Sequence, residues 1–467
     1  MAPDERPLET QSPSSAPQAS PAPSPAPSAA LSAALASGSP LRLVMICPHF
    51  TPDLAPTGEV MASIVSELVE RGHRIHVISA LPWYQHHAIE QGWNGAAVRH
   101  QDTPWGRVTR VHPFPTDKRN IPARAFAFTG FTALAALTGL LTRSRPDAVL
   151  AMSPPLTLGA AGWAVARAHR VPFVFNIQDV FPDVAVELGA ITRPSVITAA
   201  SWLERTTYRH ADAVTVLSDD LRDNVAAKIT GPAARGADAK VRVIPNFIDT
   251  DWIRPAEKEN SYRREFDLVG KRVVMYAGNI GLSQSLDLML AAAAHLAHEP
   301  DVAFVINGGG TARQGLEQRA RGLANVHFIG MQPKDRLPEV VAAADLHVVP
   351  LRAGLARSSV PSKLYSILAA GRPLVASVDQ GTEVARTVEQ AGAGLAVPPD
   401  DAEAFTKAVV RLLDAPEEAA AMGAAGRHFV ERWASPAVVA AAYESLFLEL
   451  RGARSMALRS WRVGSDG

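Results

Sequence analysis

Short apolar runs alternate with amphipathic segments along most of the chain. The first run is "LRLVMIC" (Leu41–Cys47), and "EVMASIVSELVERG" after it carries apolar residues at helical spacing up to Gly72. "RIHVISA" is the next strand candidate, and "DAVLAMS", "PFVFNIQ" and "AVTVLS" repeat the pattern with helical segments between them. Nearly continuous apolar strands that alternate with helices predict a doubly wound parallel sheet of the α/β class.

The alternation stops at a linker-like segment, "ITGPAARGADAK" (Ile229–Lys240), and then begins again. The strand candidates of this second series are "RVVMYAGNIG", "VAFVINGGG", "VHFIG", "LHVVP" and "PLVAS". The sequence therefore predicts a second parallel sheet. Because open α/β sheets bind ligands at the carboxyl ends of their strands, we expect the functional site in a cleft that both sheets face.

The composition divides the chain into four segments. Residues 1–40 are rich in Pro, Ala and Ser, and a segment that buries so little apolar surface is expected to be a disordered tail. Residues 41–240 form the predicted first domain and residues 241–432 the second. Residues 433–467 are expected to form a helix that crosses back onto the first domain, followed by a basic tail. A length of 467 residues agrees with two to three domains.

The charge and cysteine content exclude several functions. Lys plus Arg and Asp plus Glu both number 46, so no global charge attracts nucleic acid. The single Cys47 excludes an intrachain disulfide and a cysteine-based zinc site. No Asp-x-Asp pair follows a strand, and "SDD" (Ser218–Asp220) is expected to cap a helix. We therefore predict no metal site.

One stretch complicates the picture of a soluble protein. Ala125–Leu141 has no charged residue over 17 positions, and arginines flank it on both sides. We favour a buried helix of the α/β domain. The alternatives are a helix that beds shallowly in a membrane surface and a short membrane span.

Two loops that follow strands have the residues of an anion site. In "YAGNIGLSQSLD", Gly278 and Gly281 allow backbone N–H groups to approach an anion at a helix start, and "INGGG" repeats this with Gly308 and Gly309. Neither loop is a Walker motif or a complete GxGxxG fingerprint. Each could alone be a tight turn between a strand and a helix.

A third segment adds cations to the predicted anion site. "SSVPSKLYSILAAGRPLVAS" begins a helix near Pro361 and ends it at Gly371, with Lys363 in the opening turn. The helix dipole disfavours a cation there unless an anion lies in front of it. With Arg352 and Arg357, Lys363 suits a diphosphate. The alternative is a solvated basic face.

The order "GNIG…Q", "NGGG", "SSVPSKLYSILAAGRPLVAS" resembles the retaining family-4 glycosyltransferases of GT-B fold. The closest likeness is to bacterial enzymes of capsule, colanic-acid and O-antigen assembly, including fucosamine transferases. "PHFTPDLAPTGEVMASIVSELVERGHRIHVISALPWY", "NIQDVFPDVAVELGAI" and "VIPNFID" fall where that subgroup has them, so the likeness covers Leu41 to Leu450.

The resemblance implies two Rossmann-like domains that hold a nucleotide sugar, linked to UDP or GDP, mainly by the second domain. The acceptor is expected to be a glycan or a polyprenyl-diphosphate-linked sugar, with no resident cofactor and no nucleic acid as partner. The expected location is the cytoplasm or the inner face of the plasma membrane.

The resemblance also assigns residues to the site. On one side of the diphosphate lie Gly278, Asn279 and Gln284, and on the other lie Ser362 and Lys363. Gly58, in the flexible "APTGE" loop, would approach from the first domain. Asp179 matches an acid that lines the sugar pocket, and Gln178 stands where the family has a histidine.

This chain departs from the family at four further positions. Many members have an Arg and a Lys where this chain has Asn279 and Gln284, and two glutamates where it has Ser358 and Ser366. The look-alike subgroup shares these motifs, so we interpret the chain as a variant enzyme. Arg352, Arg357 and Lys363 must then neutralise most of the phosphate charge.

The resemblance implies that the leaving diphosphate departs on the face that the acceptor enters and takes the acceptor's proton. Lys363 and Asp179 are the predicted catalytic residues. His49 and His73 are expected to be structural, and His86 and His87 are weaker candidates for acceptor contact. The alternatives are a sugar-nucleotide epimerase of the same fold and a non-catalytic assembly protein with a decayed donor site.

Overall fold

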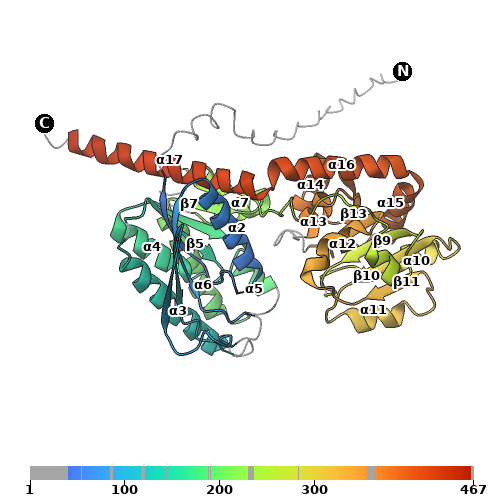
Figure 1. Ribbon diagram of the computed structural model, residues 1–467, viewed down its shortest axis with the longest axis horizontal. Coiled ribbons are helices and arrows are strands. Elements are labelled where there is room, and N and C mark those ends of the chain that lie inside the picture. Colours follow the sequence, from blue (N-terminus) through green and yellow to red (C-terminus); the bar gives the residue numbers. More distant parts are fainter. Residues whose placement is uncertain are drawn as a thin grey trace, which may run out of the picture. The chain divides into compact units, whose positions relative to one another are not determined.

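A computed structural model describes residues 40–463 except 54, 85–87, 117–120, 144, 188, 190, 230–235, 282 and 355–362. The predicted tail and the histidines His86 and His87 lie outside the described residues. The described chain builds two β-sheets with helices on both faces of each (Figure 1). The α/β fold class with two Rossmann-like sheets is therefore confirmed.

The first sheet has eight strands in the order β3-β4-β2-β1-β5-β6-β7-β8. Its pairs are parallel except for β3 with β4. The strands are β1 (Arg42–Ile46), β2 (Arg74–Ala80), β3 (Val98–Thr103), β4 (Gly106–Val111), β5 (Ala148–Ser153), β6 (Phe173–Ile177), β7 (Ala213–Val216) and β8 (Val241–Val243). Since β8 pairs with β7, the sheet extends just beyond Lys240.

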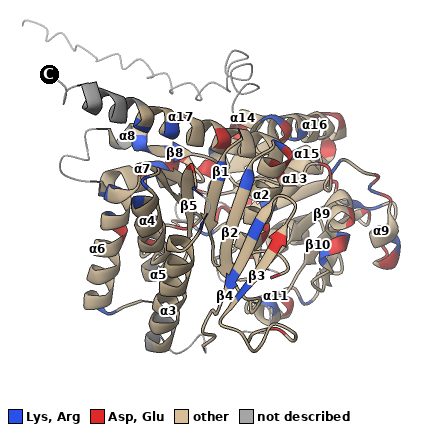
Figure 2. Ribbon diagram, turned by 60° about the vertical axis from the view of Figure 1, so that its left-hand side comes forward, with Lys and Arg blue, Asp and Glu red and all other residues tan. Residues whose placement is uncertain are grey.

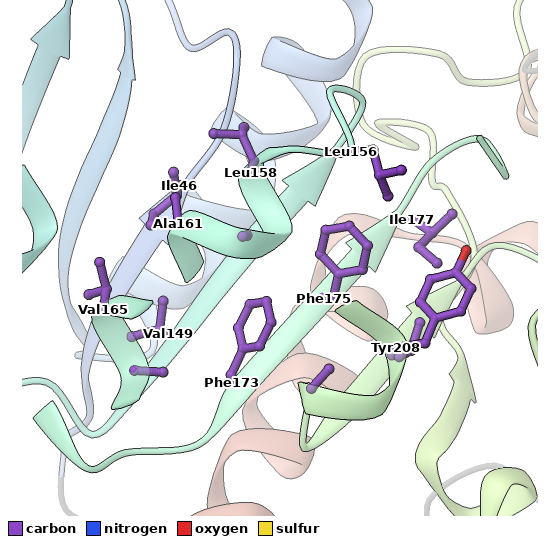
Figure 3. Packing of buried hydrophobic residues seen from close by; sticks show 14 of the residues in the cluster. Ile46, Val149, Leu156, Leu158, Ala161, Val165, Phe173, Phe175, Ile177 and Tyr208 are labelled. Carbon is purple, nitrogen blue, oxygen red and sulfur yellow. The ribbon is translucent and has the colours of Figure 1, made fainter. Parts of the chain in front are cut away.

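The central strands β1, β5 and β6 are apolar because helices cover both faces of the sheet. Figure 3 shows one of these cores, in which Phe173 and Phe175 of β6 lie near Tyr208 of α6 (Pro194–His210). The same core takes in Leu158 and Val165 of α4 (Leu158–His169). The other face packs against α2 (Pro56–Glu70) and α17 (Pro436–Val463).

The antiparallel β3–β4 hairpin is absent from the sequence prediction. Strand β3 reads "VRHQDT", and all of its residues are exposed or partly exposed. An edge strand of this kind has no apolar periodicity that could reveal it. Gly106 begins β4 with φ +153°, and a Cβ there would lie 2.0 Å from the carbonyl oxygen of Ile75.

The second sheet has six parallel strands in the order β11-β10-β9-β12-β13-β14. The strands are β9 (Arg272–Ala277), β10 (Val302–Asn307), β11 (Val326–Ile329), β12 (Leu346–Pro350), β13 (Leu374–Ser377) and β14 (Gly394–Val397). The helix before β13 ends as predicted, with Gly371 in the left-handed region at φ +66°.

The remaining helices connect these strands. In the first lobe they are α3 (Ile121–Leu140), α5 (Asp183–Glu187), α7 (Asp219–Lys228) and α8 (Ala237–Lys240). In the second they are α9 (Ser261–Glu265), α10 (Asp287–His295), α11 (Arg313–Arg319), η2 (Lys334–Arg336), α12 (Leu337–Ala342), α13 (Lys363–Ala369), α14 (Glu383–Ala391), α15 (Ala402–Asp414) and α16 (Pro416–Trp433).

The long helix α17 follows the second lobe in the chain and packs on the first. Tyr443 is fully buried, and its hydroxyl accepts a hydrogen bond of 2.8 Å from Nδ2 of Asn176 in β6. Glu444 pairs with Arg71 at 2.9 Å and with His73 at 3.1 Å. His73 is buried in this contact, as expected for a structural residue.

The apolar stretch Ala125–Leu141 forms most of α3, which is buried on one face only. Phe131 and Ala135 enter the core, whereas Phe126 is 76% exposed and Leu141 is 70% exposed. In the part of the chain that the structure describes, no helix is both long and apolar enough to cross a membrane. The helix is thus neither wholly buried nor a candidate span.

Candidate functional site

A lysine and a tyrosine meet where β9 and α13 approach each other. Nζ of Lys363 donates to the hydroxyl of Tyr276 at 2.7 Å and lies 4.1 Å from the centre of its ring. The Tyr276 hydroxyl in turn donates to the carbonyl oxygen of Asn279 at 2.5 Å. A Cβ at Gly278 would lie 3.3 Å from the same Nζ. Lys363 therefore stands directly beside the first predicted anion loop.

Lys363 occupies an environment that disfavours its own charge. Burial lowers the pKa of its ammonium from 10.5 to about 7. Among the described residues no carboxylate pairs with it, and its neighbour is the face of Tyr276. A partly buried ammonium in such a place gains from any anion that reaches it.

The loops after β9 and β10 fit against each other through their glycines. Gly308 has φ +151°, and a Cβ there would lie 1.9 Å from the carbonyl oxygen of Gly278. The backbone N–H of Ile280 donates to the carbonyl oxygen of Gly309 at 2.8 Å. A Cβ at Gly309 would meet nothing within 4 Å among the described residues. The two loops thus form one backbone surface with open space in front of Gly309.

Asn279 and Gln284 brace the first loop. Oε1 of Gln284 accepts from the backbone N–H of Gly281 at 2.9 Å. A Cβ at Gly281 would lie 2.9 Å from Nδ2 of Asn279 and 3.0 Å from Oε1 of Gln284. Both amides therefore fold over Gly281.

Arg352 follows β12 and lies among carboxylates. Its guanidinium is 4.0 Å from Asp287, and the side chain is 47% exposed. Asp400 is close as well, and a hydrogen bond from Ser285 and then the charge of Arg352 contribute to lowering the pKa of that carboxyl. Part of the charge of Arg352 is thus compensated within the protein. Arg357, Ser358 and Ser362 lie outside the described residues.

Two acids that the sequence did not single out hold the segment after β12. Asp400 accepts from the hydroxyl of Ser285 and from the backbone N–H of Ala353, the latter at 3.1 Å. Asp379 accepts from the backbone N–H of Gly354 at 2.7 Å. Each follows a strand of the second sheet, which is the one signal that could have identified it.

The predicted acid of the first lobe lies after β6. Asp179 is partly buried, and burial raises the pKa of its carboxyl. No described residue donates a hydrogen bond to it. Gln178 beside it is buried and donates to Oδ1 of Asn176 at 2.9 Å. Asp179 thus remains available to a ligand, whereas Gln178 is committed to the fold.

Gly58 does not lie in a flexible loop, and that expectation is wrong. It belongs to the first turn of α2, which Pro56 begins. A Cβ at Gly58 would lie 3.0 Å from Cβ of His49, so glycine permits close packing there. His49 pairs with buried Asp53 at 2.6 Å, which fits its expected structural role.

The "SDD" segment caps a helix as predicted. The Ser218 hydroxyl accepts from the backbone N–H of Leu221 at 3.3 Å at the start of α7. Asp220 also accepts from the backbone N–H of Glu383 and pairs with Arg386, both at 2.9 Å. These contacts link α7 to α14.

Two Rossmann-like lobes with glycine loops after the strands of the second define the GT-B fold. The chain belongs to the glycosyltransferases: the glycosyl transferase 4-like domain matches residues 57–246, and glycosyl transferases group 1 matches residues 271–415.

The chain is similar to bacterial members of this family. The colanic acid biosynthesis glycosyl transferase WcaI of Escherichia coli K12 is 28% identical over 397 residues, which cover 82% of this chain and 94% of the relative. A GDP-mannose-dependent phosphatidylinositol monomannoside mannosyltransferase of Mycobacterium tuberculosis is 30% identical over 298 residues, 57% of this chain and 75% of the relative. Anabaena HepE, solved with UDP-glucose, has a TM-score of 0.55 at 14% identity and covers 90% of this chain and all of its own.

Proposed function

We propose that this glycosyltransferase moves a sugar from a UDP- or GDP-sugar to a glycan or lipid-linked acceptor in bacterial cell-surface polysaccharide biosynthesis. The transfer retains the anomeric configuration and needs no metal. The observation that carries the proposal is the partly buried Lys363 on Tyr276, directly beside the glycine loops.

The relatives support this choice of substrates. WcaI is named for colanic acid biosynthesis, the mycobacterial relative for GDP-mannose, and HepE was solved with UDP-glucose. Both nucleotide sugars contain a diphosphate, which is the group that the loops and Lys363 suit. The proposal includes both UDP and GDP donors and does not specify the sugar.

The proposed transfer step forms one bond and breaks one bond at the anomeric carbon, and it moves one proton. The acceptor oxygen bonds to the anomeric carbon as the bond from that carbon to the diphosphate oxygen breaks, and the electron pair leaves with the diphosphate. The acceptor's proton moves to the departing phosphate oxygen. Lys363 and the backbone N–H groups of the loops stabilise the charge that grows on the diphosphate.

Asp179 has a separate part in the proposal. Its carboxylate follows β6 in the first lobe and has no hydrogen-bond donor among the described residues. It accepts a hydrogen bond from a hydroxyl of the transferred sugar or of the acceptor, which fixes that group for the transfer.

We further propose that the first lobe contacts an anionic membrane that carries the acceptor. The helices α3, α4 and α6 lie along one side of this lobe (Figure 2) and expose Phe126, Trp163 and Trp202. Their one carboxylate, Glu204, is buried and bonds to Lys228 and to Tyr208. Their exposed surface therefore combines large apolar side chains with arginines and no acid.

A donor screen tests the proposed function. The purified protein is incubated with UDP- and GDP-sugars and with a bacterial membrane lipid fraction, and the products are analysed by mass spectrometry and by NMR of the anomeric centre. We expect transfer with retention, undiminished by EDTA. Lys363→Ala should lower kcat/KM at least ~30-fold, which corresponds to about 2 kcal/mol.

The control is Lys407→Ala, which removes an exposed lysine that pairs with Glu403 on α15. It should retain full activity. A rearranged sugar nucleotide would instead identify an epimerase, and a protein that binds no nucleotide sugar would be a non-catalytic assembly factor.

A further inference from the structure

A cavity lies beside the β3–β4 hairpin, at the edge of the first sheet and outside the loops assigned to the donor. Its volume is about 550 Å³. The residues that line it include Thr51, Trp93, Arg99, His100, Gln101 and Arg110. In the described part of the chain no Asp or Glu lines it. The lining is thus polar, aromatic and cationic.

Two arginines of this cavity face each other across the hairpin. Arg99 of β3 and Arg110 of β4 are directly opposite in the antiparallel register, so their side chains leave the same face of the sheet. Their guanidinium carbons lie 5.6 Å and 5.1 Å from the ring of Trp93. Like charges at directly opposite positions destabilise a sheet. The Trp93 indole, which lies close to both guanidinium groups, compensates for only part of this repulsion.

Arg110 is the arginine with the greater need for a counter-charge, because only 2% of its surface is exposed. Its guanidinium donates to the carbonyl oxygens of Phe50 and Thr51. Its Nε is buried and has no hydrogen-bond partner among the described residues. Burial lowers the pKa of Arg110, as expected for a cation without an ion pair.

The charge of Asp53 acts on Arg110 in the direction that raises its pKa, but other groups hold the carboxylate. Asp53 is buried, pairs with His49 at 2.6 Å and accepts from the backbone N–H of Tyr84 at 3.0 Å. It makes no ion pair with Arg110 within the described chain. Among the described residues, Arg99 likewise donates only to carbonyl oxygens, those of Gly92 at 2.7 Å and Asn94 at 2.6 Å.

Arg107 is an arginine of the same hairpin that does have a carboxylate partner. It lies three residues before Arg110, is exposed, and pairs with Asp102 of β3 at 2.7 Å. Three register positions further along the hairpin, on its other face, Arg110 is paired with Arg99 and not with an aspartate. Figure 2 shows strands β3 and β4 of the hairpin, with Lys and Arg in blue and Asp and Glu in red.

We propose that this cavity binds an anionic group, a phosphate, diphosphate or carboxylate, between Arg99 and Arg110. The anion supplies the negative charge that the described lining lacks, and each guanidinium has N–H donors left for it beyond those that bond to carbonyl oxygens. The assignment of this anion to the acceptor rests on the proposed function. The existence of the anion site does not depend on that function.

Calorimetric titration of the full chain tests the site. The Lys363→Ala protein, in which donor binding is weakened, is titrated with inorganic pyrophosphate, phosphate and glucuronate. Adding Arg99→Ala should weaken binding of the preferred anion at least tenfold. Adding Arg107→Ala should leave it unchanged, because that residue already has a carboxylate partner. Arg99 is the variant of choice because Arg110 is buried and its loss endangers folding.

The outcomes separate the possible sources of the anion. Binding of pyrophosphate or phosphate that depends on Arg99 supports a phosphorylated acceptor, and binding of glucuronate supports an acidic sugar. No binding of any anion, or equal weakening by Arg99→Ala and Arg107→Ala, would overturn the site. Donor transfer is measured on the wild-type protein, so a failure of the proposed function would be distinguished from a failure of the anion site.

Discussion

At the scale of single residues, the account depends on the protonation of Lys363. Its position was visible in the sequence as a cation in an opening turn, but its environment was not. Tyr276 lies 87 positions away in the chain, so only the fold brings their side chains together. The same holds for Asp400, which meets Ser285 across 115 positions.

The lowered pKa of Lys363 predicts a pH dependence of donor binding. With a pKa of about 7, the side chain is charged below pH 7 and increasingly neutral above it. A diphosphate binds the charged form, so binding above pH 7 requires proton uptake. We expect the Kd of the preferred nucleotide sugar to rise by up to about tenfold per pH unit above pH 7.

Calorimetry between pH 6 and 9 in buffers of different ionisation enthalpy measures both the affinity and the proton uptake. Lys363→Arg is the matched control, since arginine stays charged throughout this range. Its affinity should not depend on pH. An unchanged Kd in the wild-type protein over the same range would show that Lys363 does not bind the diphosphate as a cation.

At the scale of elements, the loop after β10 contains one glycine that the fold requires and one that faces the proposed site. Gly308 is required by the backbone, since a Cβ would lie 1.9 Å from the carbonyl oxygen of Gly278. Gly309 has open space around it in the described structure. The motif "NGGG" could be read from the sequence, but which glycine serves packing and which faces the site could not.

Alanine at these two positions should therefore have opposite effects. Gly308→Ala should lower the free energy of unfolding by about 2 kcal/mol or more, because it combines a clash with a strained φ. Gly309→Ala should leave the melting temperature nearly unchanged and weaken donor binding at least several-fold. Thermal unfolding and donor titration of both variants measure this. Full donor affinity in the Gly309→Ala variant would show that the diphosphate does not bind at this loop.

At the scale of the whole molecule, the alternation of apolar strands and helices was enough to predict two doubly wound sheets. The β3–β4 hairpin was not predictable, because its outer strand is polar and exposed. The pairing of Arg99 with Arg110 depends on the register of that hairpin. Hydrophobic periodicity indicates only which residues face the core, so it does not reveal a site on a polar edge strand.

The exposed side chains of α3, α4 and α6 predict binding to anionic vesicles. Trp202 is 61% exposed and Phe126 is 76% exposed, so the double variant Phe126→Ser, Trp202→Ser should leave the fold intact. In co-sedimentation with phosphatidylglycerol vesicles, its partition coefficient should fall about tenfold or more. The control is Met331→Ser, which removes a 63% exposed apolar side chain from the second lobe. Equal binding by wild type and the double variant would contradict this membrane surface.

The most direct test of the central claim is a crystal structure of the protein with its nucleotide sugar, or with UDP or GDP. We predict that a phosphate oxygen lies within about 3 Å of Nζ of Lys363 and that other oxygens accept from backbone N–H groups of the loops after β9 and β10. A diphosphate bound elsewhere, with Lys363 still on Tyr276 and no phosphate near it, would contradict the account.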